Sequence, residues 1–247
     1  MRPAIHLLDA LYFLTRLPLP RRETTLEEVG KAACAFPVVG MLIGLLLTGA
    51  AWFLGLIFPP IPSAALVLAL WVAVTGALHL DGWVDCCDAL LAARPPEVRL
   101  EILRDVHVGA FGVVGGVVLL LVKFAALASL PAGGGWPALF LAPAFGRWAM
   151  VYAIVRYPYA RPQGLGTALK ERTGLRGLLI ATGIALVAVA VGRSWAGLLA
   201  LAVAWGLTVL FSRWALGRLP GLTGDVYGAL CELTETVVLL VWVGMGG

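Results

Sequence analysis

The residues best suited to chemistry form a short acidic run, HLDGWVDCCD at 79–88, which follows an apolar block. If this run is helical, Asp81, Asp85 and Asp88 share one stripe, because a helix repeats every 3.6 residues. Three carboxylates on one stripe repel each other, and a bound cation relieves that repulsion. Oxygen ligands without a thiolate pattern suit Mg²⁺ or Mn²⁺. We therefore expect a Mg²⁺ site here, with a solvated acidic helix end as the simpler alternative.

A second acidic segment, EILRDVHVG at 101–109, lies in the same loop between two apolar blocks. Glu101 and Asp105 are four residues apart, so a helix would place them on one face. Arg104 lies one position from that stripe and could contact a phosphate. An amphipathic surface helix with ordinary ion pairs explains the segment equally well, and its closeness to the first run favours the functional interpretation.

A third segment, TGDVYGALCE at 223–232, opens the last apolar block. Asp225 suits either a helix N-cap or a catalytic position, and we weigh the two equally. Glu232 and Glu235 would lie inside the bilayer on an otherwise apolar helix. Each must then face the bundle interior and find a partner.

Basic residues in apolar surroundings are the candidate partners. Lys123 and Arg147 fall inside apolar blocks, and Arg16 ends the N-terminal apolar stretch, so we expect all three to be buried. Lys123 and Arg147 have two open roles, an ion pair with the buried glutamates or binding of an anionic substrate. The residues that we assign to substrate binding are His79, Arg104, Lys123, Arg16 and Asp225.

Metal-bound carboxylates beside basic residues and glycines suit chemistry on phosphate esters. Mg²⁺ would neutralise charge on phosphoryl oxygens and hold the leaving group. The sequence contains no Walker loop and no nucleophilic Ser or Cys motif, and the loop RPQGLG at 161–166 is too short a pattern to identify a phosphate cradle. We expect a direct displacement, in which a hydroxyl of one substrate attacks the phosphorus of the other.

The elements that must position these residues are membrane helices. Of the 247 residues, 61% are hydrophobic and 13% are charged, whereas a soluble domain carries roughly 25% charged residues. A block of about 20 apolar residues can span a bilayer. We expect an all-α polytopic membrane bundle forming one domain, 1–247. Its seven spans are predicted at 35–58, 61–80, 110–130, 136–157, 175–192, 195–216 and 226–244.

Two smaller features complete this expected architecture. The N-terminal stretch HLLDALYFLTRLPLP at 6–20 predicts a short interfacial or re-entrant helix that stops at Pro18. Glycines within the blocks predict close approaches between helices. These glycines are Gly40, Gly44, Gly49, Gly112, Gly115 and Gly116.

The placement of Lys and Arg orients the bundle. When connections are numbered by parity from the N-terminus, every Lys and Arg except Lys123, Arg147 and Arg193 falls on or flanks one side. Positive residues stay cytoplasmic, so the acidic segments are expected to face the cytoplasm. The net charge of +4 then reports topology, and nucleic-acid binding is not expected. The four cysteines lie toward the same reducing side without a CxxC pair, which argues against disulfides and a thiolate zinc site.

In these motifs the chain resembles the cobalamin synthases (adenosylcobinamide-GDP ribazoletransferases). The resemblance runs nearly end to end. It includes FLTRLPLP at 13–20, FPVVG at 36–40, GALHLDGWVDCCDAL at 76–90, EILRDVHVGAFGVVG at 101–115 and LTGDVYGALCE at 222–232. It implies a Mg²⁺-dependent, multi-pass enzyme of the prokaryotic cytoplasmic (inner) membrane. Such an enzyme transfers the phosphocobinamide group of adenosylcobinamide-GDP to α-ribazole or its 5′-phosphate, releasing GMP, late in cobalamin (vitamin B12) synthesis.

The resemblance also implies roles for individual residues. The metal-binding acids would be Asp81, Asp85 and Asp88, the first two also being catalytic. Glu101 and Asp105 would complete the catalytic site or activate the attacking ribose hydroxyl, and Arg104 would bind phosphate. The implied partners are the two small-molecule substrates and the lipid bilayer, and a homo-oligomer or docking with other membrane-bound corrinoid enzymes stays open.

Other classes stay open beside this one. A CDP-alcohol-type phosphatidyltransferase also displaces a nucleoside monophosphate, but its pattern expects Ala-Arg after D-G-x-x, where this chain has Asp85-Cys86. A transporter or channel would spread ionisable groups through the bilayer depth, whereas most acids here gather at one mouth. A purely structural scaffold predicts that Asp85→Asn is silent.

Overall fold

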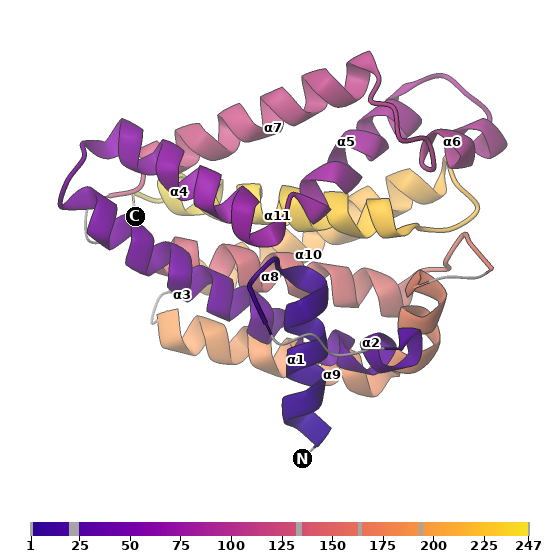
Figure 1. Ribbon diagram of the computed structural model, residues 1–247, viewed down its shortest axis with the longest axis horizontal. Helices are drawn as coiled ribbons and strands as arrows, with labels where there is room; N and C mark the ends of the chain where they lie inside the picture. The colour runs from indigo at the N-terminus through magenta and orange to yellow at the C-terminus, as the bar shows by residue number, and fades with distance from the viewer. Residues whose placement is uncertain (1, 20–24, 132–134, 163–164, 193–194, 247) are drawn as a thin grey trace.

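The computed structural model describes residues 2–19, 25–131, 135–162, 165–192 and 195–246, and within these ranges all regular elements are helices (Figure 1). The helices of the first half are α1 (Arg2–Leu14), α2 (Leu26–Ala32), the 3-10 turn η1 (Ala33–Ala35), α3 (Phe36–Gly55), α4 (Pro60–Thr75), α5 (Leu78–Leu91) and α6 (Pro96–Ile102). Those of the second half are α7 (Ala110–Ala128), α8 (Trp136–Arg156), α9 (Leu165–Gly192), α10 (Trp195–Leu216) and α11 (Gly224–Gly244).

The predicted all-α polytopic bundle is confirmed. Six helical runs are long and apolar enough to cross a membrane, and the bent pair α4–α5 raises the number to as many as 7. The N-terminal helix α1 has 13 residues, fewer than the roughly 20 that a span needs. It ends at Leu14, a few residues before the predicted stop at Pro18. Arg193, the basic residue expected on the opposite side, lies outside the described residues.

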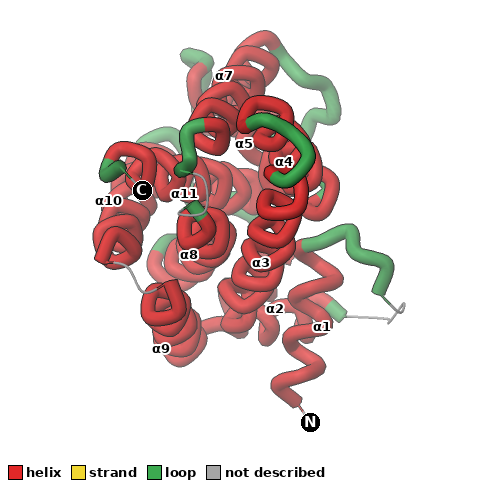
Figure 2. The backbone as a smooth tube through the Cα atoms, turned by 90° about the vertical axis from the view of Figure 1, so that its left-hand side faces the viewer, coloured by secondary structure: helices red, strands yellow, loops and turns green. Residues whose placement is uncertain are grey.

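Helix α8 lies at the centre of the bundle. The protein buries 89% of its apolar window, and Figure 2 shows α3, α9 and α11 around it. Helices α7, α9 and α10 bury only 33% of theirs. On α7, Val113, Val117 and Leu121 are exposed along one stripe. Such an apolar outer surface is what a helix presents to lipid.

The second apolar block folds into two helices, so the predicted span 61–80 is not one continuous helix. Helix α4 ends at Thr75, α5 begins at Leu78, and the two are bent by 91°. Gly76 and Ala77 both have left-handed backbone angles, with φ of 61° and 56°, and their N–H groups donate to carbonyls in the last turn of α4. The left-handed conformation costs a non-glycine residue about 1–2 kcal/mol, so packing must hold Ala77 there. The acidic run therefore sits on a helix of its own.

Arg16 lies against this break. Its N–H donates to the carbonyl of Val74 at 2.7 Å, and a Cβ added to Gly76 would lie 2.4 Å from Cγ of Arg16. The Arg16 side chain is nevertheless exposed, which corrects the expectation of a buried basic residue. The reason is that the chain leaves α1 before Arg16 and passes over the outside of the α4–α5 corner.

Two glycines of α3 bring it against α8. A Cβ added to Gly40 would lie 2.3 Å from the carbonyl oxygen of Pro143, and one added to Gly44 would lie 2.6 Å from that of Phe140. Gly49, on the same helix, has nothing within 4 Å of such a Cβ. The predicted close approach is thus confirmed for Gly40 and Gly44 and is wrong for Gly49, which lies on an exposed face of α3.

We expect Gly40→Ala to lower the free energy of unfolding by about 1–3 kcal/mol, because the methyl group overlaps the α8 backbone. Gly49→Ala is the matched control on the same helix. It should leave stability unchanged or raise it by up to about 1 kcal/mol through helix propensity. Thermal unfolding in detergent measures both, and equal effects of the two substitutions would contradict this packing.

Candidate active site

Helix α5 carries the acidic run, and Asp81, Asp85 and Asp88 all lie on it. The steps of four and three residues place these carboxylates on one stripe, as predicted. Asp81 is exposed, whereas Asp85 and Asp88 are partly buried. The stripe thus begins at the surface, where a water-soluble substrate can reach it, and continues into the protein.

On one side, α5 touches the backbone of α11. A Cβ added to Gly82 would lie 2.7 Å from the carbonyl oxygen of Asp225, and one added to Gly228 would lie 3.1 Å from that of His79. Each helix therefore contributes a glycine to the contact. This close approach places Asp225 beside the acidic stripe.

On the other side, Asp88 joins α5 to the start of α7. Its Oδ2 accepts the N–H of Gly109 at 2.7 Å, and its Oδ1 accepts the N–H of Gly112 at 2.8 Å. These N–H groups are among those left open at a helix N-terminus, where a negative charge is also favoured. A Cβ added to Gly112 would lie 2.3 Å from the Asp88 carboxylate. Asp88 therefore has a structural task, and its metal-binding role stays a prediction.

Asp81 and Asp85 accept no hydrogen bond from the described part of the chain. Asp85 interacts electrostatically with Asp81, Asp225 and Asp88, and with the guanidinium of Arg161. Asp225 also interacts with Asp81. Three carboxylates from two helices, Asp81, Asp85 and Asp225, thus form one group, which we call the acidic cluster.

Arg161 is the cation of the acidic cluster, and it comes from the loop after α8. Its Nη2 donates to Oδ2 of Asp225 and to the carbonyl of Leu103, each at 3.0 Å. Thr223 also donates to Oδ2 of Asp225, at 3.1 Å. Thr223, whose Oγ1 accepts the N–H of Val226, is the N-cap of α11. The proposed N-cap role of Asp225 is therefore wrong: the N-cap lies two residues earlier, at Thr223, which puts Asp225 in the first turn of α11.

Sequence reasoning did not assign Arg161 to the site: it counted Arg161 as a topology signal and judged its loop too short a pattern to identify a phosphate cradle. The signal available was its place at the head of the RPQGLG loop, of which Gln163 and Gly164 lie outside the described residues. The contact depends on a pairing of distant loops that periodicity does not report. Tyr159 and Leu222 form an isolated parallel bridge, and the N–H of Ala160 donates to the carbonyl of Leu222 at 2.9 Å.

The segment between α6 and α7 corrects a further expectation. Helix α6 ends at Ile102, so Glu101 and Asp105 do not share a helix face. The chain turns there because the N–H of Asp105 donates to the carbonyl of Ile102, at 3.0 Å. Asp105 is exposed and lies 2.6 Å from Nδ1 of His107. Hydrogen bonds from His107 lower the pKa of Asp105 below its ordinary value. Glu101 and Arg104 are likewise exposed, and their predicted roles are untested.

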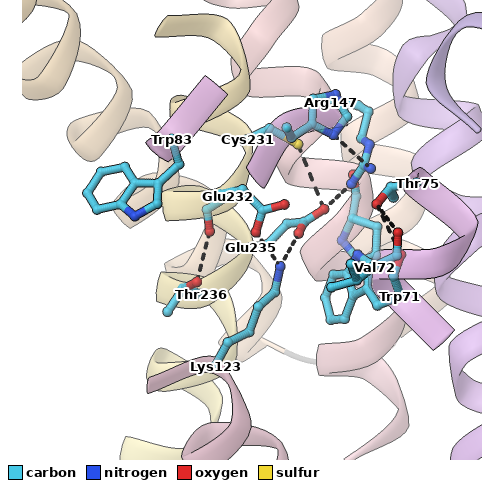
Figure 3. A network of polar contacts seen from close by, with 12 residues as sticks. Trp71, Val72, Thr75, Trp83, Lys123, Arg147, Cys231, Glu232, Glu235 and Thr236 are labelled. Atoms are coloured by element: carbon cyan, nitrogen blue, oxygen red, sulfur yellow. Dashed lines mark hydrogen bonds and ion pairs between the residues drawn. The ribbon is translucent and has the colours of Figure 1, made fainter. Parts of the chain in front are cut away.

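A second polar group lies inside the bundle, between α7, α8 and α11 (Figure 3). Nζ of Lys123 donates to Oε2 of Glu232 at 2.8 Å and to Glu235, and Nη1 of Arg147 donates to Glu235. All four side chains are buried. Two cations balance two carboxylates, which is how charges persist in an apolar bundle. Ion pairing, one of the two roles left open for Lys123 and Arg147, is confirmed, and substrate binding by Lys123 stays a prediction.

This buried charge network reaches α5 through His79. Nη2 of Arg147 lies 3.3 Å from Nδ1 of His79. A guanidinium only donates, so Nδ1 must accept and a neutral His79 carries its proton on Nε2. That Nε2 is buried without a partner in the described residues. His79 precedes Asp81 by two positions, so the network holds the start of the helix that carries the acidic cluster.

The donor atoms of the acidic cluster suit a hard divalent cation. Asp81 and Asp85 lie one helical turn apart, and Asp225 adds a third carboxylate from α11. Oxygen ligands of this kind suit Mg²⁺, which keeps several waters of its own. Among the described residues, no three His, Cys, Asp or Glu side chains are already arranged around one metal position. The carboxylates would therefore have to move together on the ion.

An apolar cavity of about 780 Å³ lies at the opposite end of the bundle, between α3, α4, α7 and α8. Its lining includes Trp52, Phe58 and Trp136 and contains no charged residue. Neither the acidic cluster nor the buried charge network touches it. The cavity is therefore separate from the candidate active site.

Comparisons with known proteins agree on one family. Residues 6–243 match the family model described as cobalamin-5-phosphate synthase. The chain is similar to the adenosylcobinamide-GDP ribazoletransferase of Pseudomonas paraeruginosa, with 45% identity over 97% of this chain and 98% of the relative. It is also similar to the protein of the same name from Desulfitobacterium hafniense, with 41% identity over 94% and 93% of the two chains. No solved structure matches the chain.

We expect Glu235→Gln to destabilise the protein by about 3–5 kcal/mol, because Lys123 and Arg147 lose the carboxylate that they share. The double substitution Lys123→Met/Glu235→Gln removes one charge of each sign and should recover much of this loss. Thermal unfolding in nanodiscs measures both variants. A double variant that is no more stable than the single one would argue against charge balance as the source of stability.

Asp88→Ala should destabilise the protein by about 1–2 kcal/mol, because two N–H groups of α7 lose their acceptor. Asp85→Asn should leave the unfolding temperature unchanged or raise it, since Asp85 accepts no hydrogen bond within the described residues and its charge is repelled by Asp81 and Asp225. Denaturation curves of the two variants test whether Asp88, and not Asp85, stabilises the fold. This assignment is wrong if Asp85→Asn proves as destabilising as Asp88→Ala.

Proposed function

Since this chain belongs to the cobalamin-5-phosphate synthase family, we propose that it is an adenosylcobinamide-GDP ribazoletransferase. It joins adenosylcobinamide-GDP to α-ribazole or α-ribazole 5′-phosphate in the synthesis of cobalamin. The products are GMP and adenosylcobalamin or its 5′-phosphate. The observation that carries this proposal, beside the family, is the acidic cluster at one end of a membrane bundle, with Arg161 as its cation.

The reaction exchanges one P–O bond for another. A ribose hydroxyl of the α-ribazole substrate attacks the phosphorus next to the corrinoid, the diphosphate bond breaks, and GMP leaves with its oxygen. A bound Mg²⁺ would neutralise charge on the phosphoryl oxygens. The residues that would hold it are Asp81 and Asp85, with Asp225 as a third oxygen donor.

Individual side chains, Asp85 among them, have further proposed roles. Asp85, half-buried and without a hydrogen-bond donor in the described residues, is the carboxylate best placed to take the proton of the attacking hydroxyl. The exposed residues Glu101, Arg104 and Asp105 lie on the segment that Arg161 ties to the site through Leu103, so they can approach a substrate from the solvent side. Asp88 supports the site by fixing α5 against α7.

We further propose that the site faces the cytoplasm from the prokaryotic inner membrane. The basic residues gather at the same end as the acidic cluster, and positive residues stay cytoplasmic. A cytoplasmic site also meets water-soluble substrates on the side where nucleotides are found.

Turnover by the protein in nanodiscs tests the proposal. With adenosylcobinamide-GDP, α-ribazole 5′-phosphate and Mg²⁺, we expect GMP and a corrinoid product in equal amounts by chromatography, and neither with a chelator. Asp85→Asn should slow the reaction at least about 100-fold, because a metal ligand is lost. Glu171→Gln, the same change at an exposed position of α9, is the control and should be silent. Product formation that survives chelation of all divalent cations would refute the metal-dependent mechanism.

A further inference from the structure

Resting on the proposed function, we infer that Arg161 binds the diphosphate of the nucleotide-bearing substrate, leaving its ion pair with Asp225 to do so. The substrate carries several negative charges into a site built of carboxylates. Among the described residues, Arg161 is the cation that acts most strongly on Asp85. An anionic substrate therefore needs this guanidinium, and its phosphate groups must displace the Asp225 carboxylate from it.

The hydrogen bonding of Arg161 leaves it able to take a second partner. Both of its contacts use Nη2, which is shared between Asp225 and the carbonyl of Leu103. Its Nε is buried and has no acceptor in the described residues. A buried N–H without an acceptor destabilises the protein, and phosphate oxygens, which bind guanidinium groups in pairs, would supply the missing acceptor.

Access and position also fit an anion. The Arg161 side chain is 24% exposed and that of Asp225 is 22% exposed, so solvent reaches the ion pair. A partly exposed pair of this kind holds its geometry weakly. Exchange of Asp225 for phosphate would free the Asp225 carboxylate beside Asp81 and Asp85 at the moment the substrate arrives. Arg161 would thereby couple nucleotide binding to assembly of the acidic cluster.

Two substitutions break the same ion pair but leave opposite partners behind. Binding of GDP, the probe, is measured at equilibrium to the full-length protein in nanodiscs with a chelator present. Arg161→Gln should weaken GDP binding at least about tenfold, because charge-assisted hydrogen bonds are lost. Asp225→Asn, which frees Arg161, should bind GDP as tightly as the unchanged protein or more tightly. Arg161→Lys keeps the charge without the paired donors, so its affinity for GDP should lie between those of the unchanged protein and Arg161→Gln.

A merely structural Arg161 predicts a different pattern. If the ion pair serves only to hold the loops, Arg161→Gln and Asp225→Asn weaken GDP binding alike, and the inference is wrong. Unchanged binding in Arg161→Gln, or no binding by the unchanged protein, also overturns it. Since the readout is GDP binding in the absence of metal, it separates this inference from the transferase activity, which product formation tests on its own.

Discussion

The site depends on the close approach of α5 to two other helices. Gly82 and Gly228 bring α5 and α11 to backbone contact, and Gly112 lets the Asp88 carboxylate reach the start of α7. A larger residue at Gly82 would meet the α11 backbone, and one at Gly112 would displace the Asp88 carboxylate. This steric constraint is what sets Asp225 of α11 beside Asp81 and Asp85 of α5, and so makes one cluster from two segments far apart in the sequence.

Carboxylates gathered in this way repel each other. The protein offsets this repulsion differently inside the bundle and at its solvent-facing end. Inside the bundle, Lys123 and Arg147 pair with Glu232 and Glu235, so the charges of the network balance without a ligand. At the solvent-facing end, Arg161 is the described cation that acts most strongly on Asp85, and the acidic cluster keeps an excess of negative charge. The balanced group suits a structural role, because its charges are already satisfied. The unbalanced group suits binding of a cation, because its charges are not.

The membrane spans and the buried ion pairs could largely be predicted from the sequence, because both follow from the cost of placing apolar groups in water and charges in lipid. Apolar block lengths gave the spans, and the cost of a buried charge required Glu232 and Glu235 to find partners, which Lys123 and Arg147 supply. The 91° break after Thr75 could not be predicted, because residues on both sides of Gly76 and Ala77 are apolar. The cap that Asp88 forms on α7 and the pairing of Arg161 with Asp225 were also hidden, since both depend on contacts between distant segments.

The central claim is that the acidic cluster holds the divalent cation of the reaction. Crystals of the protein grown with Mn²⁺, a scattering substitute for Mg²⁺, test it most directly through the anomalous signal of the ion. The account predicts a peak within coordination distance of the Asp81 and Asp85 carboxylates. A peak at another group of residues, or none while the protein binds Mn²⁺ in solution, would contradict it.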